Sequence, residues 1–114
     1  MITEKTPVVT HLTRVGLSLL PDTDVFQALP AAGQPTPEVI RSIGRTMAVR
    51  AERVAAMMEL MAAQGFSFES DKRAIYAYSN EVEAFQIKRD LIRAGFADYE
   101  FQIYLEYTRG WGML

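Results

Sequence analysis

The sequence predicts one α+β domain, in which two helices pack on a small β-sheet. Residues 37–64 and 80–94 have apolar side chains at three- and four-residue spacing, which is typical of amphipathic helices. Each segment is followed by a glycine and then by alternating apolar and polar residues, the pattern of a half-buried strand. The chain has 114 residues, enough for one domain with its own core.

The first predicted helix begins after Thr36 and ends before Gly65. Thr is favoured as an N-cap, Pro37 suits the first helical position, and glycine commonly follows a helix end. A helix of this length is about 40 Å long, against about 20 Å for a typical strand, so part of it should extend past the sheet, with Gly44 as a possible kink. One seam of the helix carries most of its apolar side chains: Ile40, Ile43, Met47, Val54, Met57 and Met61. Arg50 interrupts this seam and, if buried, needs a carboxylate or carbonyl partner.

A β-hairpin is expected after the first helix. Phe66 and Phe68 alternate with polar residues, residues 70–72 are typical of a turn, and residues 73–79 are rich in aromatic and aliphatic side chains.

The second predicted helix begins at Asn80, with Glu83 in the position of a capping box, and ends before Gly95. The final segment, residues 99–108, has the most regular alternation in the chain and is predicted to be a strand.

Residues 8–19 leave two interpretations open. The β-branched residues and Gly16 favour a strand that directs Val15, Leu17 and Leu19 to the core. Alternatively, Thr6 and Pro7 cap a helix, and a helical N-terminal segment precedes an α-ββαβ unit. We favour the strand, which gives the order βαββαβ of a ferredoxin-like sandwich with a long first helix.

Composition excludes several classes of protein. Residues 1–114 are expected to form a single domain with a Pro-rich loop at 20–36. The chain has no cysteine, which excludes disulfide frameworks and thiolate chemistry, and its formal charge of −2 attracts neither nucleic acid nor an anionic membrane. The N-terminal residues do not resemble a secretory signal, and no apolar stretch is long enough to span a bilayer. A cytoplasmic protein is expected.

Motifs for catalysis are missing from the sequence. The glycines form neither a phosphate-binding loop nor a dinucleotide fingerprint, there is no Gly-x-Ser-x-Gly elbow, and a single histidine cannot build a multi-histidine metal site. We expect no cofactor and no metal, and the interpretation leans against an enzyme. His11 is the one weak catalytic candidate, since it titrates near neutrality, although a structural role at the edge of the core is favoured.

Three tyrosines give the clearest indication of a contact surface. If Ile75 and Ala77 point to the core, then Tyr76 and Tyr78 lie on the uncovered sheet face, and Tyr104 joins them, with Arg14 and Arg73 as possible neighbours. Bases stack on this face in RNA-recognition domains of the same topology. Here the expected glycines and an aromatic residue on the first strand are missing, so the sequence disfavours binding of nucleic acid.

A protein partner suits this surface better, because tyrosines combine a large apolar area with a polar tip. Two such sheets could pack face to face across a twofold axis. Two further groups are candidate contacts with alternative core roles: Met57, Met58 and Met61 on the long helix, and Trp111 between two glycines.

The sequence therefore predicts a non-enzymatic interaction or assembly module whose partner is another copy of itself or another protein. One alternative is a small-molecule-binding or enzymatic dimer of ferredoxin-like domains with a cavity near His11. Another is binding of single-stranded nucleic acid on the sheet face.

Overall fold

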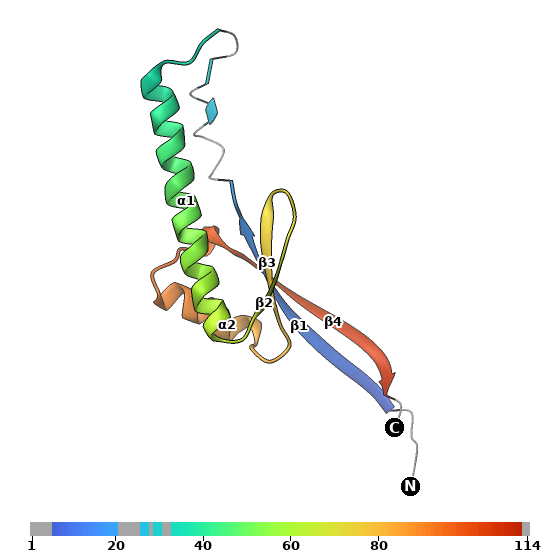
Figure 1. Ribbon diagram of the computed structural model, residues 1–114. Coiled ribbons are helices and arrows are strands. Elements are labelled where there is room, and N and C mark those ends of the chain that lie inside the picture. The colour runs from blue at the N-terminus through green and yellow to red at the C-terminus, as the bar shows by residue number, and fades with distance from the viewer. Residues whose placement is uncertain (1–5, 21–25, 28, 31–32, 113–114) are drawn as a thin grey trace.

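The computed structural model describes residues 6–20, 26–27, 29–30 and 33–112; within these, residues 6–11 and 106–112 are described by their main chain alone. The elements follow one another in the order β1 (Thr6–Ser18), α1 (Pro37–Ala63), β2 (Ser67–Ser70), β3 (Ala74–Ser79), α2 (Ala84–Arg93), the short 3-10 turn η2 (Asp98–Glu100) and β4 (Gln102–Gly112). Figure 1 shows both helices on one side of the strands.

The four strands form one antiparallel sheet in the order β2-β3-β1-β4. This confirms the predicted α+β class. Because β1 pairs with β3 on one side and with β4 on the other, the helical interpretation of residues 8–19 is wrong. The β-branched residues of this segment fit the pleated surface that these two neighbours provide.

The core lies between the sheet and the helices. Thr13, Val15 and Leu17, the odd-numbered residues in the second half of β1, face it and are fully buried. The helices contribute five buried apolar side chains: Val54, Met57 and Met61 from α1, and Ile87 and Leu91 from α2. This packing fixes which face of the sheet stays uncovered.

The predicted boundaries of α1 are confirmed. The Oγ1 atom of Thr36 accepts a hydrogen bond from the Val39 N–H at 3.3 Å, and Gly65 has a φ of +87°. Gly95 after α2 has a φ of +100°. Both glycines occupy the left-handed region that residues with a Cβ rarely adopt, which is why the helices end there.

The predicted starts of α2 and β4 are wrong. Helix α2 begins at Ala84, not Asn80, because the Ser79 Oγ accepts the N–H groups of Glu81 and Val82 and a turn forms first. Strand β4 begins at Gln102, not at residue 99, because Glu100 is buried in η2 and its carboxylate accepts the Ala97 N–H at 2.8 Å. In both places a side chain binds nearby main-chain groups and competes with the regular element.

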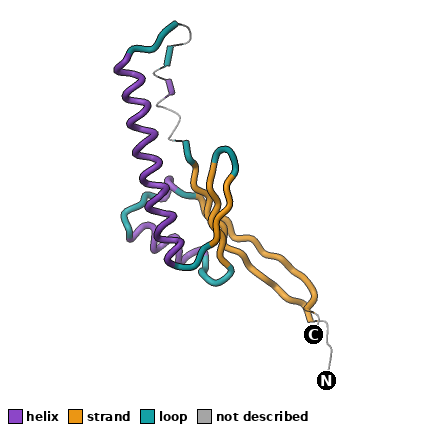
Figure 2. Tube along the Cα trace, in the orientation of Figure 1, coloured by secondary structure: helices purple, strands orange, loops and turns teal. Residues whose placement is uncertain are grey.

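Strands β1 and β4 extend well beyond the rest of the sheet. They pair from Gly16–Gln102 to Thr6–Gly112, whereas β3 pairs with β1 only over residues 13–18. The remaining part is a two-stranded ribbon that projects away from the helices (Figures 1 and 2). We call residues 6–12 and 106–112 the ribbon.

Helix α1 projects in the opposite direction. Val54, Met57 and Met61 are buried, while Ile40 and Met47 on the same seam are 55 % and 42 % exposed. The predicted overhang is therefore confirmed, and the helix is continuous through Gly44. The molecule measures 74 × 30 × 17 Å with a radius of gyration of 19.6 Å. A compact domain of this length has a radius of gyration of about 13 Å.

Among the described residues, neither helix combines the length and the apolar character needed to pass through a lipid bilayer.

Candidate contact surface

Even-numbered residues of β3 and of the adjoining parts of β1 and β4 form the sheet face that the helices leave uncovered, and β2 adds Ser67 and Glu69 to it. Arg14 lies at the centre of this face on β1, opposite Tyr78 on β3 and Tyr104 on β4, and Tyr76 lies opposite Gly16. We call Arg14, Tyr76, Tyr78 and Tyr104 the tyrosine face. The sequence anticipated this grouping because side chains alternate along a strand.

The Arg14 guanidinium is held by two aromatic rings. Its Cζ atom lies 4.4 Å from the ring centroid of Tyr104 and 5.2 Å from that of Tyr76. Both distances are within the range of a cation–π interaction, which favours arginine over the faces of aromatic rings. The three side chains therefore form one stacked group that spans β3, β1 and β4.

Gly16 explains how the two rings approach each other. A Cβ atom built on Gly16 would lie 3.4 Å from Cε1 of Tyr76 and 3.5 Å from Cε2 of Tyr104. The rings thus lean over main chain that carries no side chain. In the sequence, Gly16 was an indicator of a strand, and a glycine in the middle of a strand is also a sign that a neighbour approaches closely.

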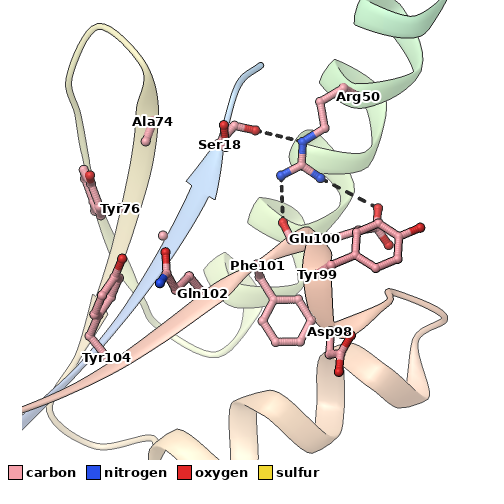
Figure 3. Close-up of a pocket in the computed structure, with 11 residues that line it drawn as sticks. Ser18, Arg50, Ala74, Tyr76, Asp98, Tyr99, Glu100, Phe101, Gln102 and Tyr104 are labelled. Carbon is pink, nitrogen blue, oxygen red and sulfur yellow. Dashed lines mark hydrogen bonds and ion pairs between the residues drawn. The ribbon is translucent and has the colours of Figure 1, made fainter. Parts of the chain in front are cut away.

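A depression of about 430 Å³ adjoins the tyrosine face (Figure 3). Strand residues and the η2 region both line it: Gly16, Ser18, Ala74, Tyr76, Gln102 and Tyr104 from the sheet, with Arg50 and residues 98–101 on the other side. Figure 3 shows the Tyr76 and Tyr104 side chains on the same side of β1. The depression therefore has one wall with the Tyr76 and Tyr104 rings. The opposite wall, which we call the polar wall, carries the charged residues Arg50, Asp98 and Glu100 beside the aromatic residues Tyr99 and Phe101.

Arg50 builds the polar wall. Its Nε donates to the Ser18 carbonyl oxygen at 2.8 Å and its Nη2 to the Glu100 carbonyl oxygen at 2.7 Å (Figure 3). Its side chain is only 12 % exposed. The predicted need for carbonyl or carboxylate partners is confirmed, and Arg50 joins the end of β1 to η2. Burial lowers the pKa of this guanidinium, while the nearby Glu100 carboxylate acts in the opposite direction.

The Glu100 carboxylate is the acceptor at the centre of this corner. Arg53 donates to both of its oxygens, from Nε at 2.7 Å and from Nη2 at 2.6 Å. The hydrogen bonds from Arg53 lower the pKa of Glu100, against the opposing effect of burial, and they raise the pKa of Arg53. Arg53 also stacks over the Phe96 ring at 4.7 Å.

The charged groups of this corner are therefore used to join α1, η2 and β1. Sequence reasoning missed Glu100, because its position fits the polar side of a strand pattern. The surface is suited to stacking and to apolar contact.

The remaining candidate residues are separate from the tyrosine face. Met57 and Met61 are fully buried in the protein's own core and have no surface to offer a partner; Met58 is half-buried. The main chains of His11 and Trp111 lie in the ribbon, opposite Tyr107 and Pro7 respectively. Their side chains lie outside the described part of the structure, so both predictions stay predictions.

Comparison with known proteins finds no family model that matches the chain, and no curated protein or solved structure matches it significantly.

Proposed function

We propose that the protein is a non-enzymatic assembly module that associates with further copies of itself through the tyrosine face, on a ferredoxin-like fold. The fold assignment is supported by the element order, in which each helix follows one strand and precedes another, and by the sheet order β2-β3-β1-β4.

The observation that carries the proposal is the stack of Tyr76, Arg14 and Tyr104 on a sheet face that neither helix covers. Tyrosine and arginine are the residue types most enriched in the cores of protein interfaces. Their rings are already ordered by the arginine, so little side-chain entropy is lost when a second surface packs on them.

The shape of the molecule supports the same proposal. Its radius of gyration of 19.6 Å, against about 13 Å for a compact domain, means that much surface is left without intramolecular cover. Ile40 and Met47, on the part of α1 that extends past the sheet, are large apolar side chains that are more than 40 % exposed.

Sedimentation velocity of the full chain tests the proposal. The double variant Tyr76→Ser, Tyr104→Ser removes the two stacked rings and is expected to lower the mass of the assembly. Phe85→Ser is the matched control, because Phe85 is an aromatic residue that is 66 % exposed on α2, away from the tyrosine face. A strictly monomeric wild-type chain, or an unchanged mass of the double variant, contradicts the proposal.

A further inference from the structure

The main-chain hydrogen bonds show which residues of each strand face an outer edge of the sheet. The Leu19 N–H donates to the Arg73 carbonyl oxygen at 2.9 Å and continues the β1–β3 register. Odd-numbered residues of β1 thus direct their N–H and C=O groups toward β3, and even-numbered residues direct them toward β4. The β1–β4 register is unbroken, so even-numbered residues of β4 face β1.

The odd-numbered residues of β4 therefore direct their main-chain groups to the outer edge: Ile103, Leu105, Tyr107, Arg109 and Trp111. In the described part of the chain no strand pairs with this edge. None of the five is proline, so each offers one donor and one acceptor. The Leu105 side chain, where the ribbon leaves the domain, is 44 % exposed.

The other edges of the sheet are protected in ways that this one is not. In the ribbon, β1 directs residues 7, 9 and 11 outward, and Pro7 has no N–H to donate. Strand β2 has only four residues, Ser67–Ser70. Proline and short length are the usual means by which edge strands avoid pairing. Strand β4 has eleven residues and an intact row of donors.

We propose that the outer edge of β4 pairs, antiparallel, with the outer edge of β4 in a second copy of this chain, which joins the two sheets into one. The inference deepens the proposed function and rests on its premise that copies of this chain associate: it adds a second contact that is separate from the tyrosine face. An assembly with both contacts is a tetramer, in which two β4-paired dimers pack through their tyrosine faces.

The geometry favours a second copy over a different partner. Antiparallel pairing about a twofold axis brings one edge against itself and closes both free edges in a single contact. A two-stranded ribbon is marginally stable in water, and pairing supplies it with further strands. The formal charge of each chain is only −2, so two copies repel each other weakly.

If the β4 strands of the two copies overlap over their full length, their pairing register is fixed. The twofold axis then passes at Tyr107, the midpoint of Gln102–Gly112, and Leu105 lies opposite position 109 of the second copy. In this register every outward donor of β4 meets an acceptor.

Proline substitution at an outward position tests the proposal with a matched control. Arg109→Pro removes a donor from the outer edge of β4 but none that binds β1. Val9→Pro removes the equivalent donor from the other edge of the ribbon, directly across the β1–β4 pair. Arg109→Ala keeps the donor and controls for the lost side chain. By sedimentation velocity, Arg109→Pro is expected to halve the assembly mass, while Val9→Pro and Arg109→Ala leave it unchanged.

Cysteine cross-linking tests the register, and the chain has no cysteine of its own. Tyr107→Cys places two thiols opposite each other with Cα atoms about 5.5 Å apart, which suits a disulfide. On oxidation it is expected to form a covalent dimer, whereas Val9→Cys and Leu105→Cys are not. An equal mixture of Leu105→Cys and Arg109→Cys is expected to form a mixed dimer.

The outcomes separate this inference from the proposed function. A monomeric wild-type chain removes both. If the tyrosine double variant lowers the mass but Arg109→Pro does not, and Tyr107→Cys stays uncross-linked, the β4 contact is wrong and the tyrosine face remains. If Arg109→Pro lowers the mass and the tyrosine variant does not, the β4 contact stands and the tyrosine face is wrong. Should the proline variants not fold, the cysteine series alone decides.

Discussion

Glu100 shows how one carboxylate can organise several elements. Its carboxylate accepts hydrogen bonds from the Arg53 guanidinium and from the Ala97 N–H, and its main-chain carbonyl oxygen accepts one from Arg50. These bonds join α1 to the turn before β4, and the same Arg50 binds the end of β1. The sequence predicted a carboxylate or carbonyl partner for Arg50, because this residue occupies the apolar seam of the first helix, where side chains are expected to be buried. It could not identify Glu100, because the contact spans half the chain and follows no periodic pattern.

Replacement of Glu100 by Gln is expected to lower the free energy of unfolding at neutral pH by about 1–3 kcal/mol, since it weakens charge-assisted hydrogen bonds at a side chain that is only 9 % exposed. Because folding lowers the pKa of Glu100, its contribution is present above the unfolded value of about 4.3 and is lost as pH falls through the folded value. The difference between wild type and variant should therefore shrink in acid, as measured by urea denaturation across a pH series.

Glu38→Gln is the control for that series. Glu38 pairs with Arg41 at 3.7 Å on the exposed part of α1, and surface pairs of this kind contribute little. It should change the unfolding free energy only slightly at any pH. A Glu100→Gln difference that is constant across the series would show that the carboxylate charge does not contribute as proposed.

Among the elements, α1 was the most predictable, since Thr36, Pro37 and Gly65 mark its ends and the apolar seam marks its buried side. The start of α2 was not, because the Ser79 hydroxyl binds two N–H groups that a longer helix would use differently. Whether residues 8–19 form a helix or a strand is decided by β3 and β4 on either side. A single sequence shows the propensity of a segment, but it does not show which strands lie beside the segment. Those neighbours decide between a helix and a strand when the pattern fits both.

Gly44 within α1 and Gly65 just after its end allow a test that isolates main-chain conformation. A Cβ atom added at Gly44 or at Gly65 meets no atom within 4 Å, but Gly65 has a φ of +87°. Gly44→Ala is therefore expected to raise the free energy of unfolding by about 0.5–1 kcal/mol, and Gly65→Ala to lower it by about 1 kcal/mol. Thermal unfolding of both variants measures this, and stabilisation by Gly65→Ala would refute the account of how α1 ends.

At the scale of the whole molecule, the sequence predicted the α+β class and the set of side chains on the uncovered sheet face. It did not predict that β1 and β4 continue together beyond the other strands, because the alternation in residues 6–12 does not reveal how far β3 extends beside them. The outer edge of β4 could therefore not be recognised from the sequence, because it is defined by which strands pair and not by any side-chain motif.

The pairing of β1 with β4 also determines when the sheet can be completed. The two strands come from opposite ends of the described chain, and together they make the longest ladder in the molecule. Closing a loop of that length is costly before its contacts form, which slows folding. During synthesis β1 emerges first and has no neighbour on either side until β3 and β4 have been made. Pro7 has no N–H and lies on the edge of β1 beyond the residues that pair with β3. It would then limit premature pairing between nascent chains.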